Sequence, residues 1–93
     1  MGEFVAWMRD RKLHKDDLTK VLAKLELLRV NGTGWGRPHV RHIAGELWEL
    51  KVNGEHDAYR VYFVIQDGVV VCLAYGRKST QDRDIIRAQG RLT

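Results

Sequence analysis

The sequence predicts an α+β domain in which helices at both ends of the chain pack on a small, mainly antiparallel, twisted sheet. Three stretches of the chain with different patterns lead to this class. Apolar residues recur every three or four positions before residue 31, alternate with polar residues from residue 47, and return to helical spacing after residue 82. Strands in the middle of a chain with helices at its ends are the order expected of an α+β fold.

Length and composition limit the architecture and the partners. A chain of 93 residues provides one modest core, so we expect a single domain over residues 1–93. The formal charge of +4 favours a polyanionic partner, although a merely soluble basic surface has the same balance. The lone Cys72 excludes a disulfide framework and a cysteine-based zinc site, and we expect it to be buried. With no signal-peptide pattern or membrane-spanning run, we expect a cytoplasmic protein without a membrane partner.

Two helices are expected before the sheet. Apolar side chains fall at helical spacing in residues 3–10, which predicts a short first helix. A longer helix is predicted over residues 16–30, where leucines repeat every three or four positions and acidic residues stand near the start. Asn31 and Gly32 end it, and the glycines and single proline of residues 33–39 predict an irregular loop.

Three strands are predicted over residues 47–52, 59–65 and 69–75, joined by turns at Asn53-Gly54 and Asp67-Gly68. Alternation along the first two strands assigns one set of side chains to the core face: Trp48, Leu50, Val52, Val61, Phe63 and Ile65. The opposite, open face then carries Glu49, Lys51, Arg60 and Tyr62.

The chain is expected to close with a helix over residues 82–91. Thr80 or Asp82 can cap its start, because short oxygen-bearing side chains accept hydrogen bonds from the first backbone N–H groups. Ile85, Ile86 and Ala88 are available to pack this helix on the sheet.

Five segments of the chain occur in the order found in one family of bacterial and phage toxins. They are residues 36–39, 47–50, 59–61, 73–78 and 85–88. Through them the sequence resembles the phage-type HigB (Gp49-like) toxins of the RelE/ParE superfamily of type II toxin-antitoxin systems, which implies a RelE-like fold. Relatives open with a strand that this chain lacks, so we expect a missing edge strand. A truncated start, a short variant or a strand added by an antitoxin would each account for the gap.

The resemblance implies a toxin that cleaves messenger RNA on the 70S ribosome and inhibits translation, without a metal or cofactor. It also implies a HigA-like helix-turn-helix antitoxin, and one expected form of the complex is a heterotetramer. The alternative is a non-catalytic phage or mobile-element protein of the same fold, which binds RNA or a host protein.

Internal transesterification of RNA needs a base for the 2′-hydroxyl, an acid for the leaving 5′-oxygen and cations for the phosphorane. The resemblance places Arg60 and Lys78 on the catalytic surface, together with Glu49 and with Lys51, where relatives usually carry an arginine. A guanidinium suits phosphate because it can engage two oxygens, and Tyr62 can stack on a base or donate a hydrogen bond. A plainer role for Arg60 is a cross-strand pair with Glu49, worth about 0.2 to 1 kcal/mol.

A basic rim that binds RNA is expected beside this surface. Its residues are Arg37, His39, Arg41, His42 and Arg77. His39 or His42 can alternatively serve as a proton shuttle. The histidines of the chain lack the spacing of a metal site.

Overall fold

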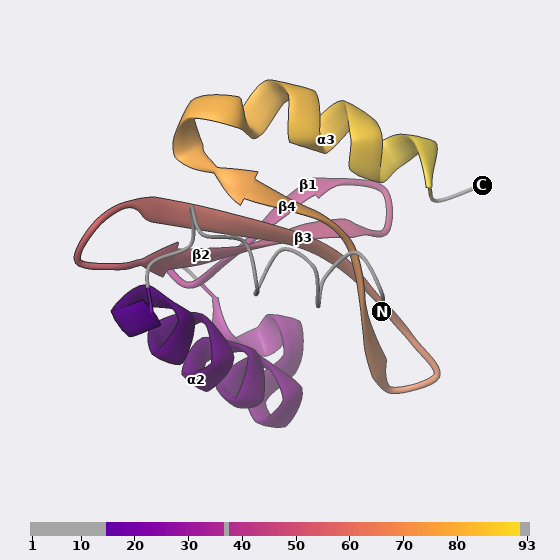
Figure 1. Ribbon diagram of the computed structural model, residues 1–93. Helices are drawn as coiled ribbons and strands as arrows, with labels where there is room; N and C mark the ends of the chain where they lie inside the picture. Colours follow the sequence, from indigo (N-terminus) through magenta and orange to yellow (C-terminus); the bar gives the residue numbers. More distant parts are fainter. Residues whose placement is uncertain (1–14, 37, 92–93) are drawn as a thin grey trace.

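The computed structural model describes residues 15–36 and 38–91, with side chains from residue 16. Its elements are α2 (Lys15–Asn31), the 3₁₀ turn η1 (Gly32–Trp35), β1 (Val40–Ala44), β2 (Leu47–Asn53), β3 (Ala58–Gln66), β4 (Val69–Arg77), the 3₁₀ turn η2 (Lys78–Thr80) and α3 (Gln81–Gly90). Figure 1 shows a sheet with α2 on one face and α3 on the other. The α+β class is therefore confirmed.

The helices differ in part from the expectation. The described ranges contain one helix ahead of the sheet, α2, and one after it, α3, instead of two before it and one after. The short helix expected over residues 3–10 lies outside the described residues. The expectation of a missing edge strand before that helix concerns the same part of the chain. None of the helices in the described ranges combines the length and apolar character needed to cross a bilayer.

The sheet is antiparallel throughout, in the order β1-β2-β3-β4. Asp67 and Gly68 both have positive φ, at 52° and 77°, as the expected two-residue turn between β3 and β4 requires. The link from β2 to β3 is longer, since the backbone N–H of Gly54 donates to the carbonyl of Asp57 at 2.9 Å. The three predicted strands are thus present, each extended at one or both ends.

β1 was not predicted. Only Val40 of its five residues is buried, so the strand carries little alternation for a sequence analysis to detect. It lies at one edge of the sheet, antiparallel to β2, with Arg41 opposite Glu49. This edge strand therefore adds the side chain of Arg41 to a sheet face that the sequence analysis had predicted from β2 and β3 alone.

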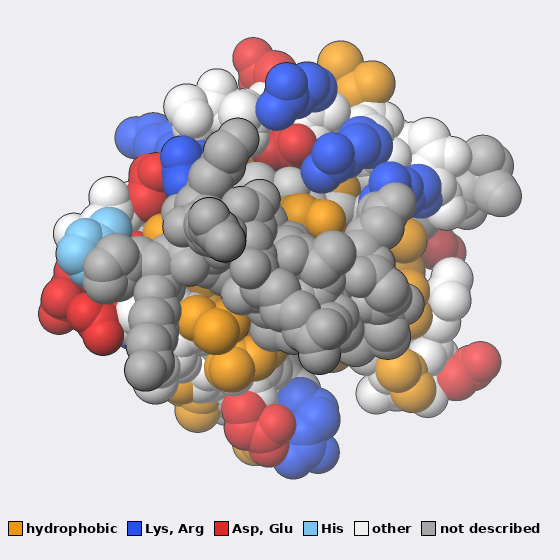
Figure 2. All heavy atoms as spheres, in the orientation of Figure 1, with side chains coloured by type: hydrophobic (Ala, Val, Ile, Leu, Met, Phe, Trp, Pro, Cys, Tyr) orange, Lys and Arg blue, Asp and Glu red, His pale blue; other side chains and the backbone are white. Residues whose placement is uncertain are grey.

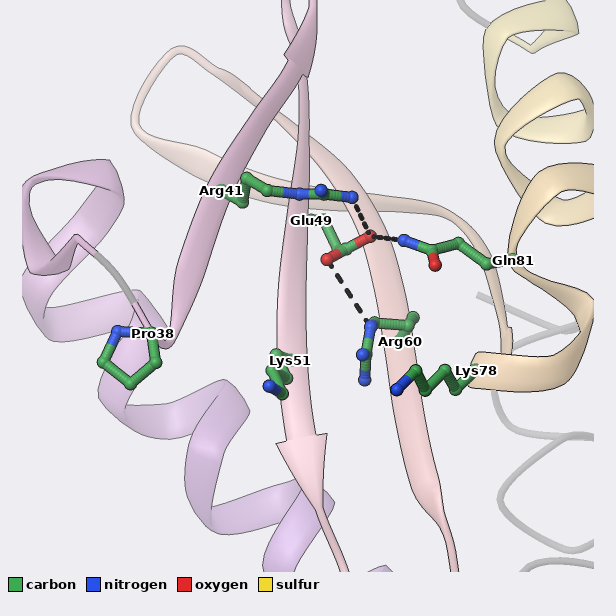
Figure 3. A pocket seen from close by; sticks show the side chains of 7 residues that line it. All are labelled: Pro38, Arg41, Glu49, Lys51, Arg60, Lys78 and Gln81. Carbon is green, nitrogen blue, oxygen red and sulfur yellow. Dashed lines mark hydrogen bonds and ion pairs between the residues drawn. The ribbon is translucent and has the colours of Figure 1, made fainter.

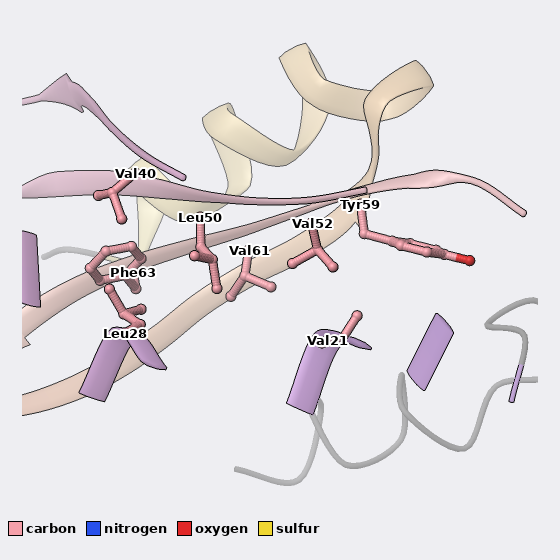
Figure 4. Packing of buried hydrophobic residues seen from close by; sticks show 8 residues of the cluster. All are labelled: Val21, Leu28, Val40, Leu50, Val52, Tyr59, Val61 and Phe63. Atoms are coloured by element: carbon pink, nitrogen blue, oxygen red, sulfur yellow. The ribbon is translucent and has the colours of Figure 1, made fainter. Parts of the chain in front are cut away.

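The main core lies between α2 and the sheet, as Figure 4 shows. Its buried members are Val21, Leu28, Val40, Leu50, Val52, Tyr59, Val61 and Phe63. Trp48 packs against this cluster, as does the half-buried Cys72, whose thiol has its pKa raised by burial to about 11. Ile65, assigned to the core face, is instead 39 % exposed, because it lies beside the β3–β4 turn, where the hairpin extends beyond the end of α2 (Figure 1).

A smaller core fills the space between the sheet and α3. Leu47, Tyr62, Ala74 and Ala88 are buried there, with Ile85 packed against them. The expectation that Tyr62 lies on an open face is therefore wrong, because α3 folds back over that part of the sheet. Ile86, which was expected to pack on the sheet, is 70 % exposed on the outer side of α3.

Asp17 fastens the first turn of α2 to the β2–β3 loop. Its carboxylate is fully buried and accepts hydrogen bonds from the backbone N–H of Glu55 at 2.7 Å, that of His56 at 3.2 Å, and the Tyr59 hydroxyl at 2.7 Å. Burial alone raises the pKa of Asp17, but these hydrogen bonds outweigh it and hold the pKa below the usual value. Gly54 passes so close that a Cβ would collide with the carboxylate.

Candidate functional site

A pocket of about 390 Å³ opens on the α3 side of the sheet, between the start of α3 and the strands. Its lining residues are Pro38, Arg41, Glu49, Lys51, Arg60, Lys78 and Gln81 (Figure 3). The pocket exists because α3 covers only the part of this face that carries Leu47, Tyr62 and Ala74. α3 does not cover the remaining part, which carries Lys51 and Arg60, although Arg60 is itself buried.

Strand periodicity and register bring the side chains of the pocket together. Glu49 and Lys51 are two residues apart on β2 and therefore share a face. Arg60 is the register partner of Lys51 on β3, and Arg41 is the partner of Glu49 on β1. Lys78 follows directly after β4. The predicted catalytic residues Glu49, Lys51, Arg60 and Lys78 thus lie in one pocket.

The carboxylate of Glu49 is the centre of a polar network and is only 4 % exposed. Oε2 accepts hydrogen bonds from Nη2 of Arg41 at 3.2 Å and from Nε2 of Gln81 at 2.7 Å. Oε1 lies 3.5 Å from Nε of Arg60 in an ion pair. Oε2 is therefore hydrogen-bonded twice, whereas Oε1 has the ion pair alone, because Nε of Arg60 makes no hydrogen bond to the described residues.

Arg60 is held from two sides and is 6 % exposed. Nη1 donates to the carbonyl of Tyr59 at 3.1 Å, while Nε faces Glu49. The plainer role considered for Arg60, pairing with Glu49, is therefore present. Yet Nη2 makes no hydrogen bond to any residue that the structure describes, and in Figure 3 the guanidinium points into the space between Lys51 and Lys78.

Lys51 and Lys78 give the pocket an excess of positive charge. Neither ammonium group forms an ion pair or hydrogen bond with a side chain in residues 16–36 or 38–91. With Arg41 and Arg60 they place four cations around the single carboxylate of Glu49. Such a cluster attracts a phosphate group, for which the arginines offer directed donors and the lysines compact charges.

Tyr62 does not line this pocket. Its side chain is fully buried beneath α3, and its hydroxyl has no hydrogen-bond partner among the described residues. Burial, and then the nearby carboxylates of Glu49 and Asp84, raise the pKa of Tyr62 well above its ordinary value. In this structure the ring has no exposed surface on which a base could stack.

The predicted RNA-binding residues are distributed over several parts of the molecule. Arg41 lines the pocket, whereas Arg37 lies outside the described residues. Arg77 forms an ion pair with Asp57, with 3.1 Å between Nε and Oδ2, at the end of β4. His42 is exposed, and its Nε2 lies 2.7 Å from the carbonyl oxygen of Gly45.

His39 belongs to the α2 side of the molecule. Its ring stacks on Trp35 with 4.2 Å between centroids, and Nδ1 lies 2.7 Å from Nζ of Lys24. Burial, and then the charge of Lys51, lower the pKa of Lys24. Neither His39 nor His42 lines the pocket, so neither is placed there to shuttle a proton.

Sequence reasoning missed two pocket residues, Pro38 and Gln81. Gln81 begins α3, and the approach of this helix to β4 depends on Gly76, where a Cβ would collide with the carboxylate of Asp84 and lie 2.8 Å from Oγ1 of Thr80. The Thr80 hydroxyl donates to Oδ2 of Asp84 at 2.6 Å. The only sign of this contact in the sequence was a glycine, Gly76, shortly before the start of a helix. Such a glycine indicates that helix and strand pack closely, but it does not identify Gln81 as a pocket residue.

A group of side chains that could bind a metal ion lies away from the pocket. Asp16, Glu55 and His56 form an exposed group of three near the β2–β3 loop, the one such group within the described ranges. They line none of the pocket described above.

Comparisons with known proteins place the chain in a family. Residues 10–93 match the model of the family described as phage derived protein Gp49-like (DUF891). The chain is also similar to an uncharacterized protein of Haemophilus influenzae, with 35 % identity over 71 residues, which is 75 % of this chain and 67 % of the relative. No solved structure matches it. The chain therefore belongs to the phage-derived Gp49-like family.

Proposed function

We propose that this protein is the toxin of a type II toxin-antitoxin system, a ribosome-dependent endoribonuclease that cleaves messenger RNA and thereby inhibits translation. The observation that carries the proposal is the pocket in which Arg60 and Lys78, from two separate segments of the toxin resemblance, meet around one buried carboxylate. Membership of the Gp49-like family supports the same reading.

The charges of the pocket suit a phosphodiester that passes through a dianionic phosphorane. Attack of the ribose 2′-oxygen on phosphorus forms a 2′,3′-cyclic phosphate and breaks the bond to the 5′-oxygen. Nη2 of Arg60 and the ammonium of Lys51 stabilise the negative charge, and the ammonium of Lys78 donates a proton to the leaving oxygen. The 2′-hydroxyl proton passes to water, from which Lys78 is reprotonated.

The occupied carboxylate gives a reason for dependence on the ribosome. The carboxylate of Glu49 is only 4 % exposed, with Oε2 hydrogen-bonded to Arg41 and Gln81 and Oε1 in an ion pair with Arg60, which leaves little room for a 2′-hydroxyl group to reach it. No histidine lines the pocket within the described part of the chain. The free protein therefore offers a phosphate group a cationic pocket without a strong base, and the ribosome supplies the geometry in which the 2′-hydroxyl proton passes to water.

Basic side chains also lie along α3, where Figure 2 shows a row of Lys and Arg side chains. Arg83 and Arg87 lie one helical turn apart and are exposed. Such a row suits the phosphate backbone of messenger or ribosomal RNA. In the cytoplasm, a helix-turn-helix antitoxin of the HigA type would restrain the toxin by covering this basic surface.

A second candidate is a binding module that holds RNA without cutting it. The absence of a strong base among the described pocket residues favours this alternative. Primer extension on messenger RNA in a reconstituted translation reaction separates the two. Cuts that require translating ribosomes and disappear in Arg60→Ala, but persist in the control Arg29→Ala on the exposed surface of α2, support the toxin. Ribosome association without cuts, from well-folded protein, supports the binding module.

A further inference from the structure

Gln81 joins the start of α3 to the floor of the pocket. It is half-buried, and its Nε2 lies 2.7 Å from Oε2 of Glu49, a residue 32 positions earlier in the chain. This is the shortest of the three polar contacts that the carboxylate makes with Arg41, Gln81 and Arg60. Figure 3 shows the amide of Gln81 reaching Glu49 from the opposite side to Arg41.

The position of Glu49 in turn affects Arg60. Oε1 of Glu49 is the only carboxylate oxygen, in the described ranges, that forms an ion pair with Arg60. The guanidinium is thus oriented by its ion pair with Glu49 on the Nε edge, where Nε makes no hydrogen bond to the described residues, and by the hydrogen bond from Nη1 to the Tyr59 carbonyl. Together these contacts direct Nη2 toward the cavity. A shift of the carboxylate would rotate the planar guanidinium away from the phosphate.

Arg41 and Gln81 differ in how a bound phosphate would affect them. The side chain of Arg41 is 43 % exposed and charged, so an incoming phosphate competes with Glu49 for it. Gln81 is neutral, is tied to α3 and has little attraction to phosphate. Its hydrogen bond is therefore the contact that persists when RNA occupies the pocket.

We propose that Gln81 is a positioning residue, which fixes the carboxylate of Glu49 and through it aims Arg60 at the scissile phosphate. This inference rests on the proposed function for its effect on cleavage. Its structural content, control of the orientation of Arg60, does not depend on RNA being cut.

The substitution Gln81→Met tests the proposal, since it keeps the length of the side chain and removes the donor. Gln89→Met, at an exposed position of the same helix, is the matched control. Gln81→Lys restores a donor to Glu49. Two readouts are measured: the Nε–Hε signal of Arg60 in a nitrogen–proton NMR spectrum, and kcat and KM for ribosome-dependent cleavage.

In Gln81→Met we expect the Arg60 signal to move or broaden by exchange, and kcat to fall roughly 10-fold to 100-fold, the effect of losing one hydrogen bond to a charged group. KM should stay within about threefold, because the cations that attract RNA are unchanged. Gln81→Lys should recover most of kcat, and Gln89→Met should behave as the unmodified protein.

An unchanged Arg60 signal in Gln81→Met overturns the proposal. If the variant also melts at a lower temperature, Gln81 stabilises the fold without controlling the orientation of Arg60. An unchanged kcat in a variant whose Arg60 signal has moved also overturns it. If the unmodified protein cuts no RNA, the proposed function fails, and the Arg60 signal alone then decides whether Gln81 positions the guanidinium.

Discussion

The two faces of the sheet are built from the same strands and yet differ in what they bury. The face under α2 holds a continuous apolar cluster that includes Leu28, Leu50 and Phe63. The face under α3 holds a smaller apolar cluster and, beside it, the buried charges of Glu49 and Arg60. α2 is 17 residues long and α3 is 10, so the shorter helix leaves part of its face uncovered. The uncovered part is where charged strand residues form a pocket.

The energetic contributions of the two faces differ as well. Burial of apolar side chains against α2 stabilises the fold by roughly 25 cal/mol for each Å² removed from water. Buried ion pairs such as Arg60–Glu49 add little net stability, because the cost of desolvation offsets their attraction. Charges retained at such a cost are better explained by a role in binding than by a role in folding.

Loss of the central guanidinium should produce the largest change in activity. In Arg60→Ala we expect ribosome-dependent cleavage to fall by about two to four orders of magnitude, as when one transition-state donor is removed. The free energy of unfolding should fall by only about 1 to 3 kcal/mol, since Glu49 loses the partner of Oε1 but keeps its hydrogen bonds to Arg41 and Gln81 through Oε2. Single-turnover cleavage assays measure the loss of activity, and urea denaturation measures the free energy of unfolding. Normal cleavage by a folded variant would remove Arg60 from the mechanism.

A substitution on the α2 face should show the opposite pattern. Phe63 is fully buried, so Phe63→Ala should lower the free energy of unfolding by about 3 to 5 kcal/mol through lost burial and a new cavity. Ile65→Ala, beside the turn, is the comparison and should cost much less. Denaturant titration of both variants is the measurement, and equal losses would show that the hairpin end is packed as tightly as the core.

Asp17 makes the stability of the α2 side depend on pH. Its pKa is lower in the folded chain than in the unfolded one, so its contribution is present above the unfolded pKa and is lost as the pH falls through the folded value. Asp17→Asn should destabilise the protein by roughly 1.5 to 3 kcal/mol near neutral pH. The difference from the unmodified protein should shrink in acid. Urea denaturation at pH 7 and pH 3 measures it, and a constant difference would contradict the account.

Lys51→Arg should produce the smallest effect of the series. In the toxin family that the sequence resembles, arginine is usual at this position. A guanidinium keeps the positive charge of the pocket and can donate two hydrogen bonds to one phosphate group. We expect cleavage to change by no more than a few-fold, with Lys51→Ala as the comparison that removes the charge. A loss in Lys51→Arg as large as in Lys51→Ala would show that Lys51 acts through its shape or its proton and not through charge.

Much of the fold and part of the pocket follow from the sequence, because strand periodicity is a local property. Alternation along β2 and β3 was sufficient to place Lys51 and Arg60 on one face. The burial of Tyr62 was not predictable in this way, since it depends on how far α3 folds back across the sheet. The contact between Gln81 and Glu49 joins residues 32 positions apart and leaves no periodic signal. β1 was missed because a short edge strand with one buried residue hardly alternates.

The most direct test of the central claim is an NMR titration with a short messenger RNA fragment that carries a 2′-deoxy sugar at the cleavage position and so cannot be cut. We predict saturable shifts at Lys51, Arg60 and Lys78 in the α3-side pocket, and none at Arg29 on the exposed surface of α2. Shifts confined to the α2 side of the molecule would contradict the assignment of the pocket as the RNA site.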